Sequence, residues 1–357
     1  MATRFEIVLH GERTAALRAA AEEAFEEIER LEAQLSQFRS GSEIANLNAR
    51  AAREPVRVTP PLFALLQHCR KLHDETDGAF DITVAPLLRC WGFRDGSGHL
   101  PDPKALADAR SKVGMPLVEL NPDDYTVRFA REGVMLDLGA IGKGYAIERA
   151  VEILREAGVT SALLHGGTST VQAIGHPPDA ENWKVAVENP LPAPLPERGL
   201  QSAATSESNL SQREKPQGNL LLPTSLRTEV RSPGEGYDES EPQKTQSPSS
   251  ATKDLLATVE LKDEAMSVSG IRGKFFEADG KTFGHILDPR TGQPAMNAAV
   301  AVVVLPSATE TDALSTALLT LGPDGHNKIF NLRPGMRTLV ATESNGALSV
   351  ESRNLPV

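Results

Sequence analysis

One histidine, His285, stands where the sequence predicts the end of a strand. It precedes the segment Ile-Leu-Asp-Pro-Arg-Thr-Gly292, which is typical of a rigid turn. The pKa of an unperturbed imidazole lies near neutrality, so a histidine held there could take a proton from a substrate hydroxyl. A histidine at a strand end often has a structural role instead, and the residue alone does not decide between the two.

Further along the chain, a carboxylate and a hydroxyl are spaced so that both would lie on the same face of a helix. Asp312 and Thr316 lie four residues apart at the start of a helix predicted to begin near residue 311 and to end at Gly322. Mg²⁺ prefers oxygen ligands, so one carboxylate, one hydroxyl and a backbone carbonyl would suffice to hold it. The alternative is that Asp312 caps the helix and Thr316 packs in the core.

A glycine-rich turn, Leu138-Gly-Ala-Ile-Gly-Lys-Gly-Tyr145, connects a predicted strand over 134–138 to a helix that ends at Gly158. Backbone N–H groups and the helix dipole favour a phosphate at such a turn, although most turns of this kind bind nothing. The spacing matches neither the Walker loop nor the dinucleotide-binding fingerprint. Asp137 lies in the apolar strand before the turn, where a carboxylate must be hydrogen-bonded or functional.

The elements around these residues predict an α+β protein. Apolar residues recur at helical spacing over 13–38 and 61–77. Strands are predicted over 159–165, 183–187, 255–261, 283–287 and 300–306, with a final hairpin over 339–350. Because strands and helices alternate irregularly, mixed, largely antiparallel sheets flanked by helices fit better than a doubly wound sheet.

Residues 190–252 break this pattern, with nine prolines and ten serines but one aromatic residue. Such a composition buries too little apolar surface to offset the entropy of ordering, so we expect a low-complexity, disordered insert. The predicted strands on either side suggest that it interrupts a hairpin-like connection within a single domain over 1–357. A linker between two domains is the alternative.

Composition excludes several classes of function. The 357 residues carry a formal net charge of −11, which argues against binding nucleic acid or anionic lipid. Cys69 and Cys90 lie among apolar neighbours, and the sequence contains no Cys-x-x-Cys motif or Cys/His cluster that could bind zinc. No apolar run is long enough to span a membrane or to form a signal peptide, so the chain as written is expected in the cytoplasm. A longer natural N-terminus would instead allow export or membrane anchoring.

Several motifs together resemble the ApbE-type FAD:protein FMN transferase family. They occur in one order along the chain, outside the insert: Asp77-Gly-Ala-Phe-Asp-Ile-Thr-Val84, Trp91-Gly-Phe93, Leu136-Asp-Leu-Gly-Ala-Ile-Gly-Lys-Gly-Tyr145, His165-Gly-Gly167, Ser269-Gly270, His285-Ile-Leu-Asp-Pro-Arg-Thr-Gly292 and Asp312-Ala-Leu-Ser-Thr316. The resemblance implies an ApbE-like fold with a cleft that binds FAD as a substrate.

The resemblance also implies roles for individual residues. A magnesium ion beside the FAD pyrophosphate would be held by the backbone oxygen of Ala140 and by Asp312 and Thr316, with Ser315 adjacent. His285 corresponds to the proposed base. The positions that correspond to FAD contacts are Met1, Phe38, Ala79, Phe80, Asp81, Asp137, Lys143 and Ile286.

The implied reaction is Mg²⁺-dependent transfer of FMN from FAD to a Ser or Thr hydroxyl of an acceptor flavoprotein, with release of AMP. The acceptor would carry a segment of the type Asp-Gly-x-Thr-Ser/Thr-Gly-Ala-Thr. Two alternatives are a Mg²⁺-dependent FAD pyrophosphatase that gives free FMN and AMP, and a FAD-binding protein without catalysis. His165, Thr168 and Glu148 depart from the family's pattern, and the segment Ser269-Gly-Ile-Arg272 lacks the family's usual tyrosine shortly after it.

Overall fold

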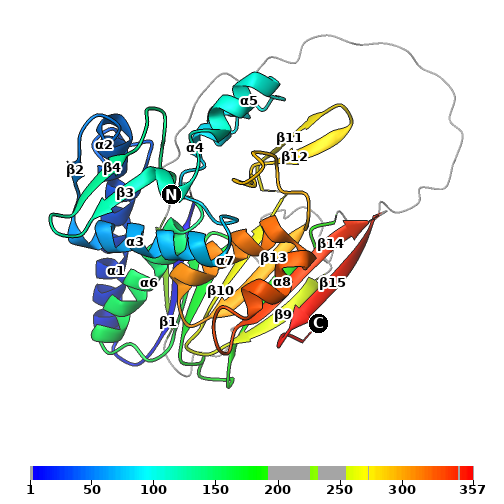
Figure 1. The fold of residues 1–357 in the computed structure, drawn as a ribbon. Helices are drawn as coiled ribbons and strands as arrows, with labels where there is room; N and C mark the ends of the chain where they lie inside the picture. Colours follow the sequence, from blue (N-terminus) through cyan, green and yellow to red (C-terminus); the bar gives the residue numbers. More distant parts are fainter. Residues whose placement is uncertain (1–2, 192–225, 232–254, 272, 345, 357) are drawn as a thin grey trace, which may run out of the picture.

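The computed structural model describes residues 3–191, 226–231, 255–271, 273–344 and 346–356 (Figure 1). Of the predicted insert over 190–252, this includes residues 190–191 and the backbone of one strand, β8 (Leu226–Arg231). The remainder of the insert lies outside the described residues, so its disorder stays a prediction.

An eight-stranded sheet forms the centre of the molecule, in the order β15-β14-β13-β10-β6-β5-β1-β8. Each neighbouring pair is antiparallel except β1 and β8, which are parallel. The prediction of an α+β protein with mixed, largely antiparallel sheets is confirmed. The strands other than β8 span Phe5–His10 (β1), Ala162–Gly166 (β5), Thr170–Ile174 (β6), Ala265–Gly270 (β10), Val300–Leu305 (β13), Arg337–Ser344 (β14) and Ala347–Arg353 (β15).

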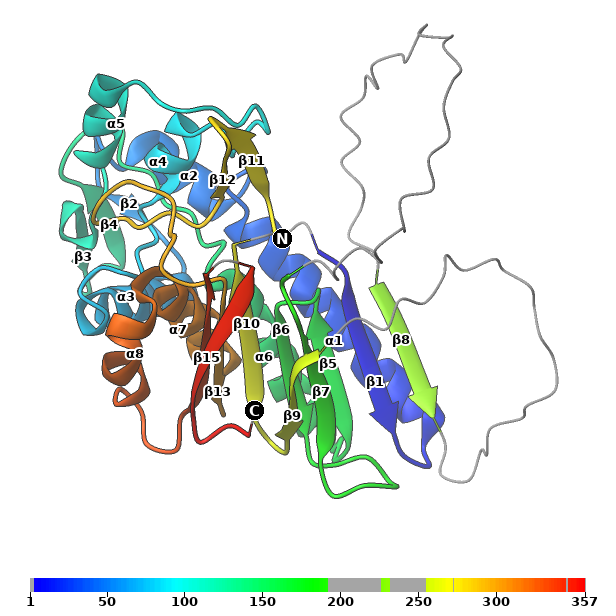
Figure 2. The same ribbon diagram turned by 90° about the vertical axis from the view of Figure 1, so that its right-hand side faces the viewer.

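Both faces of this sheet are covered. Strand β13 is buried at every position, and its side chains alternate between two separate clusters of apolar residues. Ala301 and Val303 pack toward the helices, whereas Val300 and Val302 pack against the antiparallel pair β7 (Trp183–Glu188) and β9 (Leu255–Leu261) (Figure 2). Burial on both faces explains the unbroken apolar sequence of β13.

Strands β7 and β9 confirm the predicted hairpin-like connection. Trp183 lies opposite Leu261 and Glu188 lies opposite Leu255, so the chain leaves this pair and returns to it at neighbouring positions. No helix in the described parts of the chain is long and apolar enough to cross a bilayer.

Helices α1 (Thr14–Leu35), α6 (Gly142–Glu156), α7 (Ala308–Leu321) and α8 (Pro323–Phe330) pack on the other side of the sheet. The predicted apolar stripe of α1 is confirmed, because its members from Leu17 to Leu35 are buried. Phe38, predicted to be the last member, lies beyond the end of the helix and is exposed.

Helix α7 begins earlier than predicted. Its N-cap is Ser307, whose Oγ accepts a hydrogen bond from the N–H of Glu310 at 3.2 Å. The carboxylate of Glu148 also accepts the N–H of Thr309 at 2.8 Å and the hydroxyl of Ser307 at 2.7 Å. The alternative that Asp312 caps the helix is therefore wrong, and Glu148 has a structural role in this chain.

A second part of the molecule lies above the helices in Figure 1. The small sheet β2-β4-β3 and the hairpin β11-β12 accompany short helices there. The hairpin packs on α4 through Phe276 and Phe283, which contact the ring of Trp91. The elements span Glu43–Arg50 (α2), Val56–Arg57 (β2), Pro60–Glu75 (α3), Ala85–Cys90 (α4), Pro103–Arg110 (α5), Met115–Leu117 (a 3₁₀ turn), Val118–Asn121 (β3), Thr126–Phe129 (β4), Phe275–Ala278 (β11) and Lys281–Gly284 (β12).

The predicted strand over 134–138 is wrong. The side chain of Asn48 takes the place of a neighbouring strand, because its Oδ1 accepts the N–H of Leu136 at 2.7 Å and its Nδ2 donates to the carbonyl of Leu136 at 3.0 Å. The N–H of Asp137 donates to the carbonyl of Ile82 at 2.7 Å. These bonds hold the segment extended beside the turn that follows.

Candidate functional site

Asp312 lies in the second turn of α7 and is only 4% exposed. Its Oδ2 accepts the backbone N–H of Gly144 at 3.0 Å, and its Oδ1 accepts the hydroxyl of Thr170 at 3.3 Å. The ammonium of Lys143 lies 3.1 Å from Oδ1. Groups from α6 and β6 thus hold this carboxylate in one orientation.

Gly144 allows α6 to approach α7 closely enough for this contact. A Cβ atom at residue 144 would lie 2.1 Å from the carbonyl oxygen of Ala308 and 2.8 Å from the Cβ of Asp312. Only glycine fits at such a distance from another helix. The glycine-rich turn therefore serves close helix packing, and it also brings Lys143 to the carboxylate.

A chain of buried hydroxyl groups extends behind Asp312. Thr170 accepts a hydrogen bond from Ser267 at 3.2 Å, and the Ser267 and Thr311 hydroxyls lie 2.8 Å apart. Thr311 donates to the carbonyl of Ala308 at 3.0 Å. The three hydroxyl-bearing residues are at most 2% exposed, so this network is part of the core. Thr170 and Ser267 share the sequence feature that marks Asp137, a polar residue within an apolar segment.

A second hydroxyl cluster lies one turn along α7. The Oγ of Ser269 lies 2.9 Å from that of Ser315 and 3.3 Å from the hydroxyl of Thr316. Both α7 hydroxyls also donate to the backbone carbonyl of Asp312, at 3.1 and 3.2 Å. Thr316 thus follows Asp312 by one turn of α7, as their spacing predicted, and Ser315 lies beside it.

The groups around Asp312 fit a hard cation better than a soft one. The donors are carboxylate, hydroxyl and carbonyl oxygens, the types that Mg²⁺ prefers. The Lys143 ammonium contacts both the Asp312 carboxylate and the carbonyl of Gly139, at 3.1 Å each, so positive charge is favoured here. Within the described residues there is no group of three or more His, Cys, Asp or Glu side chains that could hold a metal, so a cation would depend on one carboxylate.

His285 directly follows β12, and the backbone of Lys274 fixes its ring. The Nδ1 atom lies 3.1 Å from the carbonyl oxygen of Lys274 and 3.3 Å from its N–H. The carbonyl contact fits the tautomer with the proton on Nδ1, which leaves a lone pair on Nε2, whereas the N–H contact fits the opposite tautomer. Only the first tautomer can act as a base through Nε2. A Cβ at Gly273 would lie 3.1 Å from the imidazole, so the chain passes close to the ring.

The surroundings of His285 keep its ring neutral. Burial lowers the pKa of His285, and the charges of Lys274 and Lys143 act in the same direction. The hydrogen bond to the Lys274 backbone and the charge of Asp137 oppose them, but the net direction is downward. A neutral imidazole with a free Nε2 can accept a proton at neutral pH.

Asp137 lies in the same electrostatic neighbourhood. Its Oδ1 accepts the N–H of Gly139 at 2.7 Å, and its Oδ2 accepts a hydrogen bond from the side chain of Gln37. The resulting contact joins the loop after α1 to the glycine-rich turn, across 100 residues of sequence. Gln37 was not predicted, and no local sequence pattern marks it.

The other predicted FAD contacts differ in their exposure. Phe38 is 69% exposed, with the guanidinium of Arg94 5.4 Å from the centre of its ring. Ile286 is partly buried against the main core. Ala79 and Phe80 are almost fully buried, and Met1 lies outside the described residues. Their FAD contacts stay predictions.

Asp81 is a structural anchor in this structure. Its carboxylate accepts the N–H and the hydroxyl of Thr83 at 2.7 and 2.6 Å, and the N–H of Met115 at 3.2 Å. It also lies 3.1 Å from Nδ1 of His73, and hydrogen bonding to Asp81 raises the pKa of that histidine against the effect of burial. Both carboxylate oxygens of Asp81 are therefore in contact with groups of the protein itself.

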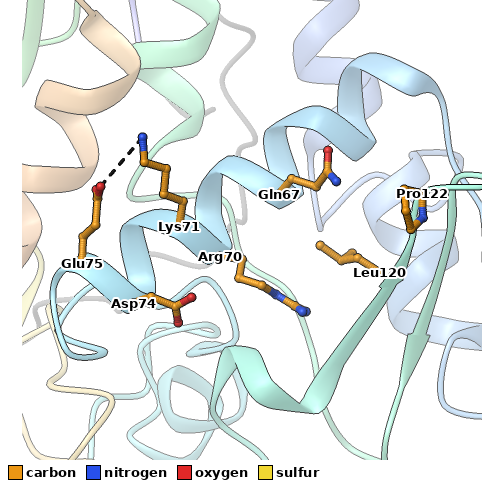
Figure 3. A pocket seen from close by; sticks show the side chains of 7 residues that line it. All are labelled: Gln67, Arg70, Lys71, Asp74, Glu75, Leu120 and Pro122. Carbon is orange, nitrogen blue, oxygen red and sulfur yellow. Dashed lines mark ion pairs between the residues drawn. The ribbon is translucent and has the colours of Figure 1, made fainter.

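A depression of about 510 Å³ lies elsewhere, beside α3 (Figure 3). Its walls are side chains of α3, of β3 and of the residue after β3: Gln67, Arg70, Lys71, Asp74, Glu75, Leu120 and Pro122. Two cations offset two carboxylates, and Lys71 pairs with Glu75 at 3.8 Å. It contains no residue that we predicted for the site.

Two other departures from the family's pattern lie on or beside β5. Burial lowers the pKa of His165, and Thr168 is exposed in the turn between β5 and β6. Neither contacts Asp312, whose neighbour from this turn is Thr170.

The fold and these groups define an α+β protein with a cation-attracting carboxylate, an adjacent glycine-rich turn and a fixed, neutral imidazole. The chain belongs to the ApbE family, whose model matches residues 1–212 and 237–340.

Named relatives and solved structures agree with this membership. The chain is 28% identical to an FAD:protein FMN transferase of Treponema pallidum, an alignment that covers 94% of this chain and 81% of the relative. It is similar to the crystal structure of the ApbE protein from Thermotoga maritima, with 25% identity, a TM-score of 0.70 and coverage of 93% and 88%. The apo form of the flavinyl transferase ApbE from Pseudomonas stutzeri gives 25% identity, a TM-score of 0.68 and coverage of 94% and 86%.

Proposed function

We propose that this protein is a Mg²⁺-dependent FAD:protein FMN transferase that transfers FMN to a Ser or Thr hydroxyl of an acceptor protein. The observation that carries the proposal is that Lys143 links two fixed groups: its ammonium lies 3.1 Å from the oriented carboxylate of Asp312, and its charge adds to the effect of burial in lowering the pKa of the imidazole of His285. The names of the relatives, which are FAD:protein FMN transferases, support the same activity.

The proton transfer is the step assigned to His285. Its Nε2 takes the proton of the acceptor hydroxyl while the oxygen attacks the FMN-side phosphorus of FAD. A new phosphorus–oxygen bond forms to the acceptor, the bond to the AMP oxygen breaks, and AMP leaves with the bonding electrons. The Nδ1 contact with Lys274 holds the ring in position throughout.

Asp312, Thr316 and the carbonyl of Ala140 would hold the magnesium ion, with Ser315 adjacent. The ion would neutralise charge that develops on the pyrophosphate. Thr170 and the N–H of Gly144 would keep the Asp312 carboxylate aimed at it. Asp137 and Lys143 would contact FAD, together with Phe38.

The test is mass spectrometry of an acceptor bearing an Asp-Gly-x-Thr-Ser/Thr-Gly-Ala-Thr segment after incubation with FAD and Mg²⁺. We expect one FMN phosphoester on the hydroxyl and an equal amount of AMP. Rapid release of free FMN without an acceptor would identify a pyrophosphatase instead. FAD binding without any AMP would identify a binding protein.

A further inference from the structure

Arg94 makes no ion pair with any residue that the structure describes. It follows the Trp91-Gly-Phe93 segment, and its guanidinium carbon lies 5.4 Å from the centre of the Phe38 ring. Its Nη1 is buried and has no hydrogen-bond partner among the described residues. A guanidinium carries five donors, and a buried donor without an acceptor is costly. An acceptor supplied by a ligand would remove that cost.

The charges around Arg94 favour an anion as that ligand. Burial and the charge of Arg89 lower the pKa of Arg94, which shows that its charge is poorly compensated. The carboxylate of Asp137 acts in the opposite direction, but its two oxygens already accept hydrogen bonds from Gly139 and Gln37. Both oxygens of the carboxylate that acts on Arg94 thus already accept hydrogen bonds from other groups.

The location favours a phosphate of FAD over other anions. Contacts connect Arg94 to the glycine-rich turn: its guanidinium lies over Phe38, and the neighbouring Gln37 donates a hydrogen bond to Asp137, which accepts the N–H of Gly139. Asp137 also acts electrostatically on both Arg94 and His285. The imidazole of His285 must face the reacting phosphorus if it is the base. An arginine in that neighbourhood can present two N–H groups to two phosphate oxygens at once.

We propose that Arg94, held by its cation–π contact with Phe38, binds a pyrophosphate oxygen of FAD and distinguishes FAD from flavins without a phosphate. The inference rests on the proposed function, since it takes FAD as the substrate. The contact with Phe38 holds the flat guanidinium group in place, so that little side-chain freedom is lost when the anion binds.

The experiment compares binding of FAD and of riboflavin, which has the same ring system and no phosphate, by quenching of flavin fluorescence without an acceptor. Arg94→Gln should weaken FAD binding about tenfold or more, because a hydrogen bond to a charged partner is lost. Riboflavin binding should stay within about twofold of the wild type. The FAD affinity of Arg94→Lys should lie between those of the wild type and Arg94→Gln, since an ammonium keeps the charge but cannot present two N–H groups in one plane.

Arg89→Gln is the matched control. Arg89 is the exposed arginine at the end of α4. Its replacement changes the net charge of the protein by the same amount as Arg94→Gln. It should change FAD affinity by less than about twofold, since exposed charges are well screened. Circular dichroism and thermal melting should be unchanged in each variant, because no hydrogen bond of Arg94 to another described side chain is lost.

Each other outcome overturns the assignment. Unchanged FAD affinity in Arg94→Gln, or equal losses for FAD and riboflavin, would mean that Arg94 does not contact phosphate. Unchanged FAD affinity with a higher KM for the acceptor would assign the guanidinium to an acceptor carboxylate. If the wild type fails to bind FAD at all, the proposed function fails before any variant is compared.

Discussion

The backbone of Lys274 decides which nitrogen of His285 is left for a substrate. The carbonyl of Lys274 fixes the ring through Nδ1, so Nε2 is the nitrogen left for a substrate. Burial keeps the ring neutral, which makes it a proton acceptor over most of the physiological range.

We predict that His285→Ala lowers the rate of FMN transfer by roughly 100-fold or more, because the acceptor hydroxyl loses its base. FAD affinity should survive, since the ring is not assigned to FAD. His176→Ala is a suitable control, because His176 is also a histidine but exposed, with its Nδ1 beside the Pro177 carbonyl. A transfer rate within a few-fold of the wild type would reject His285 as the base.

The pH profile offers an independent test of the same residue. The pKa of His285 is lowered, so the neutral form persists below pH 6.5, and the acid limb of kcat/KM should have its midpoint below that value. Lys274→Gln removes one of the charges that lower the pKa and should move the midpoint upward. A midpoint above about 6.5, or no response to Lys274→Gln, would contradict the assignment.

The sequence could predict His285 and the Asp312–Thr316 pair because each belongs to a short motif. Gln37 and Arg94 could not be predicted in this way. The partner of Gln37 is 100 residues away in the sequence. Arg94 lies in the segment after α4, whereas Phe38, which it contacts, lies in the segment after α1. Contacts of this kind depend on tertiary packing, which leaves no periodic trace in the sequence.

At the scale of elements, the junction of α6, α7 and β6 builds the candidate cation site. Gly144 sets the distance between the helices, and Thr170 extends from β6 to the same carboxylate. The start of α7 was predicted too late, because Ser307 and Glu148 supply a cap that spans 159 residues of sequence. The strand predicted over 134–138 failed for a similar reason, since Asn48 supplies its hydrogen bonds.

We predict that Asp312→Ala abolishes Mg²⁺-dependent turnover with the fold intact, because the carboxylate on which the site depends is lost. Binding of Mn²⁺, measured by electron paramagnetic resonance, should be lost in parallel. Asp312→Asn retains the shape of the side chain and should also fail to bind the ion. Turnover near the wild-type rate at saturating Mg²⁺ would refute the cation site.

Thr170→Val tests the network behind that carboxylate. Removing one hydroxyl should weaken Mn²⁺ binding about fivefold, since a net hydrogen bond contributes about 1 kcal/mol. Thr170→Ser restores the hydroxyl and should restore the affinity, which a purely structural effect of β6 would not require. If valine and serine variants bind Mn²⁺ equally well, Thr170 does not position Asp312.

At the scale of the whole molecule, a sheet buried on both faces determines the arrangement. The alternation of β13 between two apolar clusters ties the helical layer to the β7–β9 pair. The sequence predicted the class of fold and the strands with long apolar runs, among them β5, β7, β9 and β13. It did not indicate the central strands β6 and β10, whose apolar residues are interrupted by polar ones. It did not indicate β8, which lies in a segment poor in apolar residues and pairs with the edge of β1.

We predict that replacing residues 192–250 by a short Gly/Ser linker leaves FAD affinity unchanged. The ends to be joined are close, since Glu188 and Leu255 are paired across β7 and β9. The melting temperature should fall by roughly a few degrees, because the variant also loses the pairing of β8 with β1. If the loss of β8 causes this fall in melting temperature, a linker twice as long should lower the melting temperature by the same amount. Loss of FAD binding would show that the segment belongs to the site.

The chain leaves the sheet pair at the end of β7 and comes back beside it at the start of β9, which has a practical consequence. A cut in the connection would divide the protein into two fragments that meet again along β6–β10, β7–β9 and α6–α7. Lys143, Gly144 and Thr170 belong to the first fragment, whereas Asp312 and His285 belong to the second. Neither fragment alone holds the whole site, so flavinylation by the mixture would report their reassembly and make this protein a natural scaffold for a split reporter.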